Sequence, residues 1–440
     1  MSLKMKSMLM ILLMACAAFA GCLGSDDDDD KEEESSDAKP EWLDASDAGY
    51  TYASNVDNHR SLMNDLCEIK DAASSDGGYD FTTAKDIYMN GKNAQKDDGS
   101  YRTLDGFASA SGKNHEYDNY YGSEGSIGAH IMAALDGTGD FENTSNTVRY
   151  QGTAKLTVNM GMVGYTIHEL NAAIIKAEAG NWGTDDAQHA WDEGWAFFHG
   201  PDEHYGCSPA KVMEKRAGDF GTADADGVAA TFAATEAAMN AGLTALQNED
   251  MQGVVDARDE VLKNLVIVYS QAVLKYTSKM DSNDTAEKYQ AEGYAFWKAI
   301  EAYAAHHTAD ACYNNKTHTM SYIGVGKNAS NCDSFQWYEN TTMHDNTTYT
   351  GCYNMATHTE ANMAVGPMGA PMNETNCNEG FGAVGSTGMP MYFANYGATE
   401  INNILDLTDA SQLGTSYDVS AHLQPVWDHY GITAADIGAM

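Results

Sequence analysis

Basic residues are scarce in this chain. Among its 440 residues, 25 are Lys or Arg and 64 are Asp or Glu, which gives a formal net charge of −39 at pH 7. Because nucleic-acid binding requires a basic patch or stripe, we predict that no nucleic acid is a partner. The acidic surface is typical of proteins that stay soluble in salty water, and the same field would concentrate metal cations near the protein.

Catalytic and redox motifs are also missing. The sequence has no Gly-x-Ser-x-Gly, no Gly-x-x-x-x-Gly-Lys-Ser/Thr loop and no His-Glu-x-x-His. The absence of Cys-x-x-Cys argues against a thiolate zinc site or a redox dithiol. The absence of Glu-x-x-His pairs argues against a four-helix di-iron ferroxidase. We therefore predict that the protein is not an enzyme; an extracellular helical hydrolase would be revealed only by activity screening.

The only long apolar run lies at the N-terminus, between Met8 and Ala20, and follows two lysines. It is too short to span a bilayer comfortably and is typical of an export signal. Small residues directly precede Cys22, as in a lipobox. We predict that residues 1–21 are a signal peptide and that Cys22 is lipidated, so that its acyl chains hold the protein at the membrane. A plain signal peptide cleaved near Ala20 is the alternative.

An acidic tether follows the predicted anchor. Residues 22–45 include the runs Asp26 to Asp30 and Glu32 to Glu34, which repel one another and cannot form a core. The rest of the chain is long enough for one large core or two to three smaller ones. We therefore expect an exported protein, lipid-anchored at the cell surface or in the periplasmic space.

One stretch of sequence occurs twice. Residues 191–198 (Trp-Asp-Glu-Gly-Trp-Ala-Phe-Phe) match residues 290–297 (Gln-Ala-Glu-Gly-Tyr-Ala-Phe-Trp), with Glu193 and Glu292 in register at an offset of 292 − 193 = 99 residues. The same offset aligns the helices predicted upstream of each copy. Each copy is thus predicted to be a helix, a short connection and an aromatic-rich helix. This spacing is longer than that of a solenoid repeat and favours two tandem bundle-like halves.

Apolar residues spaced three and four apart predict helices through most of the chain. The predicted helices are 80–91, 152–178, 185–199, 223–247, 252–279, 284–306, 393–407 and 417–430. The predicted fold class is therefore all-α, an internally duplicated helical bundle made of two tandem helical-hairpin units. We place the first helical repeat unit at 46–205, the second at 206–309, and the C-terminal helices that pack on the bundle at 393–440.

Residues 310–392 differ in composition from the helical part. They are rich in Thr, Asn, Gly, Met and Cys, and they carry Asn-x-Ser/Thr sequons at Asn315, Asn328, Asn340, Asn346 and Asn373. We predict a disulfide-stapled, loop-rich insertion with little regular structure, open to glycosylation. An even number of cysteines in an exported chain predicts three disulfides, and the sequence does not decide their pairing. These cysteines are Cys67, Cys207, Cys312, Cys332, Cys352 and Cys377.

The strongest group of metal-type side chains begins on the second helix of the first copy. His189 and Glu193 are one helical turn apart and point the same way, and His199 and His204 follow at the next turn of the chain. Imidazole and carboxylate together suit iron, zinc or manganese better than calcium. In the second copy Lys stands at the positions of both helical histidines, so only the glutamate is repeated. Glu193 and Glu292 are therefore either ligands or architectural hydrogen-bond acceptors.

Glu169 lies on the preceding helix and could approach this group. It is the one acidic residue in an otherwise apolar column, and its counterpart in the second copy is Val268. A buried glutamate needs a partner, and a metal ion or a histidine would serve. Glu169 is therefore a third candidate ligand.

Methionines supply a second metal hypothesis. Thioethers and nearby imidazoles hold Cu(I). Flexible methionines in a loop-rich segment are more often gap-filling core residues, which is the competing interpretation. The side chains concerned are Met355, Met363, Met368 and Met372, with His344 and His358.

Three segments resemble a known family. The sequences Asp-Glu-Gly-Trp-Ala-Phe-Phe-His-Gly at 192–200, Ala-Lys-Asp-Ile-Tyr-Met-Asn-Gly-Lys-Asn at 84–93 and Gly-Ile-Thr-Ala-Ala-Asp-Ile-Gly at 431–438 are similar to the algal Fe-assimilating, low-iron-inducible periplasmic proteins. The likeness covers residues 80–306 and 395–440 in order. It implies a secreted protein linked to iron acquisition and without enzymatic activity, and it supplies no ligand positions.

These observations predict a lipid-anchored surface protein that binds iron outside the membrane and raises its supply to a transporter. The alternative function is a non-metal glycosylated surface or attachment protein, with the helical bundle as scaffold and the 310–392 insertion contacting a partner. Zinc and copper remain alternative metals. The candidate ligands are, in order, Glu193, His189, Glu169, His199 and His204, with Glu292 as the counterpart in the second copy.

Overall fold

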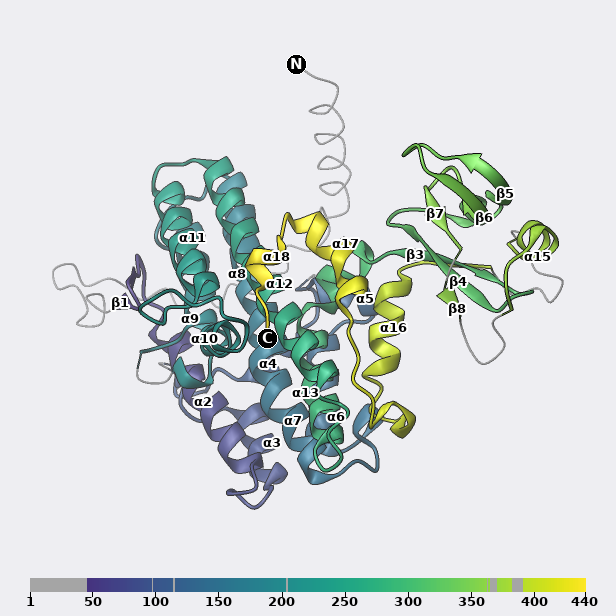
Figure 1. Ribbon diagram of the computed structural model, residues 1–440. Helices are drawn as coiled ribbons and strands as arrows, with labels where there is room; N and C mark the ends of the chain where they lie inside the picture. The colour runs from purple at the N-terminus through teal and green to yellow at the C-terminus, as the bar shows by residue number, and fades with distance from the viewer. Residues whose placement is uncertain are drawn as a thin grey trace.

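The computed structural model of the protein describes residues 46–96, 98–113, 115–202, 205–361, 363–364, 370–381 and 391–440. The predicted signal peptide, the lipidation site Cys22 and the acidic tether lie outside these residues. Most of the described chain is helical, and Figure 1 shows the helices gathered in one body with a smaller β-rich part on its side. Within the described ranges, every helix is too short or too polar to span a bilayer.

The helical body begins with two short strands and continues as a series of helices. Its first half contains β1 (Ser46–Asp47), β2 (Tyr50–Thr51), α2 (Asp57–Ala73), α3 (Phe81–Asn90), α4 (Leu104–Ala108), α5 (Glu116–Tyr121), α6 (Ser126–Asp136), α7 (Asn146–Lys155), α8 (Met162–Glu178) and α9 (Ala187–Phe198). Its second half contains α10 (Pro209–Phe220), α11 (Ala230–Gln247), α12 (Met251–Ser278) and α13 (Ala286–Ala304). The C-terminal helices α16 (Tyr396–Ile404), α17 (Ser420–Tyr430) and α18 (Ala434–Ile437) pack back on this body.

Local sequence explains where these helices form and stop. The Asp80 side chain accepts a hydrogen bond from the Thr83 backbone N–H at the start of α3, and Gly91 ends that helix with a φ of 67°. In α12 the predicted apolar face is buried, with Val261, Leu265 and their neighbours inside one large core. The predicted helices thus occur close to the predicted positions.

The two copies of the predicted repeat are both helical hairpins, α8–α9 and α12–α13. The α8 helix continues directly from α7 through a π-helical turn, Leu156–Gly161, so the helical run is longer than the predicted 152–178. The Asn159 side chain lies in that turn and accepts a hydrogen bond from the Tyr269 hydroxyl of α12 at 2.9 Å. This contact ties the two hairpins together. Their origin by duplication stays a prediction.

The prediction that residues 310–392 have little regular structure is wrong, and the fold is therefore mostly helical and not all-α. One antiparallel sheet has the order β8-β4-β3-β9 and the other β5-β6-β7. The Thr and aromatic residues of this segment favour strands, which the abundance of Asn and Gly conceals. The elements are β3 (Asp310–Asn314), β4 (Thr319–Gly324), α14 (Ala329–Cys332), β5 (Phe335–Thr342), β6 (Thr348–Asn354), β7 (Thr359–Glu360), β8 (Met363–Ala364), α15 (Glu374–Gly380) and β9 (Tyr392–Phe393).

The prediction of three disulfides is confirmed, and the structure supplies their pairing. Cys67 of α2 pairs with Cys207, which lies in the 3₁₀ turn Tyr205–Cys207 after α9. The other two bonds hold the β-rich part, since Cys312–Cys332 joins β3 to α14 and Cys352–Cys377 joins β6 to α15. All four of these cysteines lie in the small core of the β-rich part. A core of this size contributes little stability, and the two disulfides add to it.

Candidate metal site

The buried carboxylate of Asp192, in α9, holds in place the segment that precedes α2. Asp192 is fully buried. It accepts hydrogen bonds from the Tyr50 hydroxyl at 2.7 Å, the Ala53 backbone N–H at 2.9 Å, and the backbone N–H and hydroxyl of Ser54 at 2.8 and 2.7 Å. Burial raises the pKa of Asp192 to about 6, although these hydrogen bonds act to lower it. The contacts set where α2 crosses α9.

At that crossing, two imidazoles meet one carboxylate oxygen. His59 of α2 places Nε2 2.9 Å from Glu193 Oε1, and His189 of α9 places Nε2 3.1 Å from the same oxygen. The side chains of His59 and Glu193 are 7% and 14% exposed, whereas that of His189 is 30% exposed. The cluster is therefore enclosed and opens to solvent on the side of His189.

A second carboxyl group completes the cluster from α8. Glu169 is hydrogen-bonded to Glu193. The approach of the two helices depends on Gly194, since a Cβ at this position would lie 2.8 Å from Leu170 Cδ2. A glycine next to Glu193 thus lets α9 come close enough to α8 for the two glutamates to touch.

The protonation states follow from these contacts. Burial, and then the negative charge of Glu193, raise the pKa of Glu169 well above its ordinary value, so Glu169 is protonated and donates to Glu193. Burial alone would also raise the pKa of Glu193, but the two imidazoles and their hydrogen bonds hold it well below its usual range. Glu193 is therefore the acceptor at the centre of the cluster.

The two histidines differ in charge. Burial would lower the pKa of His189, but its hydrogen bond to Glu193 and the charge of that carboxylate outweigh burial and raise it. The Ser54 hydroxyl donates to Asp192 and lies 2.8 Å from His189 Nδ1, so Nδ1 must carry a proton and donate to Ser54. Burial lowers the pKa of His59, and its Nδ1 is buried without a hydrogen-bond partner. His189 is thus an imidazolium and His59 a neutral ring.

The structure brings together three of the predicted ligands, Glu193, His189 and Glu169, and keeps His199 apart. The His199 ring is 2% exposed and stacks between Trp195 and Tyr205, with both ring centroids 5.4 Å away. Its Nδ1 lies 2.8 Å from the Gly200 carbonyl oxygen. We therefore leave His199 out of the site. His204 lies outside the described residues, so its role stays a prediction.

Glu292 occupies a different environment from that of Glu193. It is 7% exposed, and its charge interacts with that of the Lys155 ammonium group. A lysine competes with a metal cation for this carboxylate, and no imidazole forms an ion pair with it within the described residues, so we do not retain Glu292 as a ligand.

The predicted copper ligands are brought together in part. His344 and His358 have ring centroids 4.0 Å apart and line a hollow of about 410 Å³ with Tyr322, Tyr353 and Glu360. Met355 is exposed, and the Met372 sulfur packs against the small core of the β-rich part, where it receives weak contacts from Asn314 and Thr317. Met372 is thus a core residue, and the side chains of Met363 and Met368 lie outside the described set.

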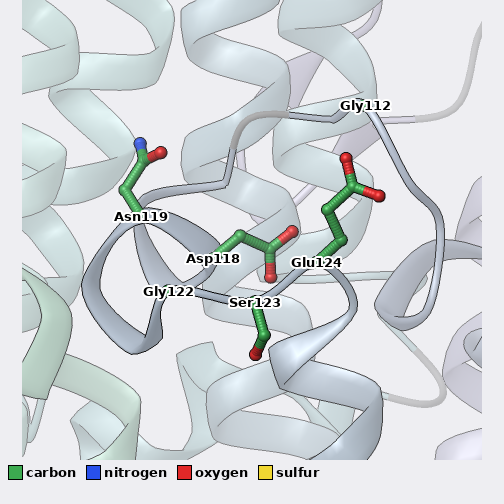
Figure 2. A pocket seen from close by; sticks show the side chains of 6 residues that line it. All are labelled: Gly112, Asp118, Asn119, Gly122, Ser123 and Glu124. Carbon is green, nitrogen blue, oxygen red and sulfur yellow. The ribbon is translucent and has the colours of Figure 1, made fainter.

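Another hollow, of about 230 Å³, lies at the turn between α5 and α6 and is lined by polar groups (Figure 2). Figure 2 shows the Asp118 and Glu124 carboxylates at its wall. Asp118 accepts hydrogen bonds from the backbone N–H groups of Gly125 and Ser126 and from the Ser126 hydroxyl. Asp118 therefore stabilises the first turn of α6. The described side chains that line this hollow do not form a metal site.

Sequence reasoning missed His59. It lies on the buried stripe of α2 with Leu62, Met63, Leu66 and Ile69. A histidine at helical spacing within such a stripe was the available signal. What the sequence could not supply is its partner, because the contact to Glu193 depends on how α2 crosses α9.

The fold and the cluster define a class: a disulfide-bonded, mostly helical protein with a largely enclosed group of two carboxyls and two imidazoles. No set of three or more His, Cys, Asp or Glu in the described ranges is already arranged around a point that a metal ion could take. The model of the low iron-inducible periplasmic protein family matches residues 43–330, and the chain belongs to this family. No curated protein and no solved structure matches the chain. The resemblance seen in the sequence is thereby confirmed, and the description of the family refers to low iron and to the periplasm.

Proposed function

We propose that this protein binds iron outside the cell membrane and supports iron assimilation, with His59, Glu169, His189 and Glu193 as the iron ligands. The family description, low iron-inducible and periplasmic, supports the choice of iron. Two carboxylates and two imidazoles form a mixed oxygen and nitrogen donor set that suits iron, with zinc as the competing metal. The protein acts as a binding protein and needs no catalysis.

One observation carries the proposal: three protons point at the same carboxylate. They belong to His59 Nε2, His189 Nε2 and the Glu169 carboxyl, and all face Glu193. A cation that enters at this point replaces the protons and binds the groups that held them.

The surrounding residues would hold His189 ready for this exchange. Nδ1 of His189 donates to Ser54, whose hydroxyl donates to Asp192. Such a chain of contacts fixes which ring nitrogen is free to bind a metal and orients the ring. The side chain of His189 is more exposed than those of His59 and Glu193, so iron would enter beside it.

The rest of the chain would keep the site at the membrane and rich in cations. A lipid on Cys22 would anchor the protein, with residues 22–45 as a spacer toward a metal transporter. The net charge of −39 would raise the local concentration of iron near the surface. The partner transporter and the anchor are parts of this proposal.

The test compares two glutamates that occupy the same position in the two copies. We expect Glu193→Gln to weaken Fe²⁺ binding, measured by anaerobic calorimetry on the purified full chain, by about a hundredfold or more, because the central anion is lost. The matched control, Glu292→Gln, should bind iron as the unmodified protein does. Equal affinity in both variants would remove Glu193 from the site. A purified protein that holds no iron, zinc or copper and shows no binding heat would favour the attachment-protein alternative.

A further inference from the structure

A short sequence in the β-rich part occurs twice. Cys-Tyr-Asn-x-x-Thr-His-Thr stands at residues 312–319 and again at residues 352–359, at an offset of 352 − 312 = 40 residues. Each copy forms an antiparallel hairpin, β3–β4 or β6–β7, in the part that Figure 1 shows beside the helical body. The two hairpins can therefore be compared position by position.

The turns of the two hairpins have the same backbone. Asn314 and Asn354 each accept hydrogen bonds from two backbone N–H groups of their own turn. His318 and His358 then follow in the left-handed region, with φ of 53° and 56°. Any difference between the two histidines therefore comes from the side chains around them.

Those surroundings differ. In the first copy the Tyr313 hydroxyl lies 2.6 Å from His318 Nδ1, so these two side chains are bonded to each other. In the second copy the Tyr353 hydroxyl lies 3.4 Å from Nδ1 of His344, a residue of the turn between β5 and β6. The ring centres of His344 and His358 are 4.0 Å apart. The second copy thus brings two imidazoles together.

The strand register places a carboxylate beside them. Tyr353 is paired with Glu360 across β6 and β7, at the position that Met320 holds opposite Tyr313 in the first copy. Residues directly opposite on antiparallel strands have side chains on the same face of the sheet. Glu360 lines the hollow of about 410 Å³ together with both imidazoles and Tyr353. A buried methionine in one copy is thus an exposed carboxylate at the hollow in the other.

Two other groups that line the hollow are held by neighbours outside this set. The Tyr322 hydroxyl lies 2.9 Å from His422 Nδ1. The Asp345 carboxylate accepts hydrogen bonds from the backbone N–H and the hydroxyl of Thr347 at 3.0 and 2.7 Å. The two imidazoles and the Glu360 carboxylate are therefore the groups most open to a ligand.

We propose that His344, His358 and Glu360 bind one divalent transition-metal ion of the zinc type. Two imidazole nitrogens and a carboxylate oxygen are ligands that zinc takes, with water in the fourth position. The contact of Tyr353 with Nδ1 of His344 leaves Nε2 for the ion and orients the ring. All three ligand side chains are exposed, so Glu360 can turn toward the rings and the rings can separate to admit the ion.

This site is separate from the proposed iron site. Its three ligands lie beyond residue 330, where the family match ends, so the inference does not rest on the iron proposal. Its donors are nitrogen and oxygen, which suit zinc better than the Cu(I) that the methionines of this segment would hold. The β-rich part would thus have a metal-binding role of its own.

The test is calorimetric titration of Zn²⁺ into the purified full chain at neutral pH, at an ionic strength high enough to screen weak binding to the acidic surface. We expect His358→Asn to lower the number of tightly bound Zn²⁺ ions by one, because a ligand is lost. Asparagine also adopts a positive φ, so the turn should keep its backbone. His344→Asn should have the same effect.

The matched control is His318→Asn, which makes the same change at the equivalent position of the first copy. It should leave the number of bound Zn²⁺ ions unchanged. Equal loss in His318→Asn and His358→Asn, or no loss in either, would overturn the proposal. If His358→Asn fails to fold, the comparison of His344→Asn with His318→Asn decides, because His344 lies exposed in a different turn.

Discussion

At the scale of single residues, Asp192 holds the proposed metal site together. Its carboxylate serves four donors of the segment before α2. We expect Asp192→Ala to lower the free energy of unfolding by about 3 kcal/mol, because buried donors lose their acceptor. Urea unfolding followed by circular dichroism measures the change. Asp202→Ala is the matched control: Asp202 also accepts a hydrogen bond from this part of the chain, at Ala48, but its side chain is 62% exposed. Equal losses would contradict the assignment.

The same scale shows what could be predicted of the site. His189 and Glu193 are neighbours on one helical face, and Glu169 was singled out as an acidic residue in an apolar column, so local pattern sufficed for all three. The contact of His59 with Glu193 and that of Lys155 with Glu292 could not be predicted, because both depend on helix crossings between distant segments. His199 was predicted as a ligand because it is close to Glu193 in the sequence. Its ring instead stacks between Trp195 and Tyr205.

At the scale of elements, the approach of α8 and α9 depends on Gly194. A Cβ there would meet Leu170 Cδ2 at 2.8 Å and separate the helices. We expect Gly194→Ala to lower the free energy of unfolding by about 1–3 kcal/mol and to weaken iron binding, because Glu169 and Glu193 move apart. Thermal unfolding and calorimetry measure the two effects.

Two further variants make this prediction specific. Gly218→Ala in α10 meets no atom within 4 Å and should stabilise the protein by about 1 kcal/mol, as expected in an open helix. In a Leu170→Ala background the added methyl has room, so Gly194→Ala should cost less than it does alone. A cost that does not depend on residue 170 would place the strain elsewhere.

Long, periodic elements were predictable and the β-rich part was not. The α12 and α13 helices have many apolar residues at helical spacing, and a pattern of that length leaves little doubt about the period. The strands β5 and β6 have 8 and 7 residues, and they contain Thr, Asn and aromatic residues without a regular alternation of apolar and polar side chains. They pair with each other as consecutive antiparallel strands, and the Cys352–Cys377 bond joins β6 to α15, a pairing that composition does not report.

At the scale of the whole molecule, iron binding should depend on pH. Iron must displace the protons of Glu169 and His189, whose pKa values are both raised in the folded protein. We expect affinity to increase as pH rises and about two protons to be released per iron near pH 7. Calorimetry in buffers of different ionisation enthalpy counts them. Glu169→Gln should release about one fewer. Binding heats that do not vary with the buffer would show that the protons are not displaced.

The same groups link the stability of the metal-free protein to pH, with a defined sign. The stability that His189 contributes is fully present below its unfolded pKa and is lost as pH rises through its raised folded value. Glu169 and Asp192 also have raised pKa values in the folded protein. The free energy of unfolding therefore falls as pH rises from the pKa of each group in the unfolded chain to its pKa in the folded protein. Glu193, with a lowered pKa, acts in the opposite direction and loses stability as pH falls.

The Cys67–Cys207 bond makes the proposed iron binding depend on the redox state of the compartment. It joins the helix that carries His59 to the turn that follows the helix carrying Glu193, across a sequence separation of 140 residues. We expect reduction by dithiothreitol, or the Cys67→Ser/Cys207→Ser pair, to weaken iron binding because α2 is then held less firmly; unchanged affinity would show otherwise. A chain still inside the reducing cytoplasm would leave the cell's own iron alone and become a scavenger only after export.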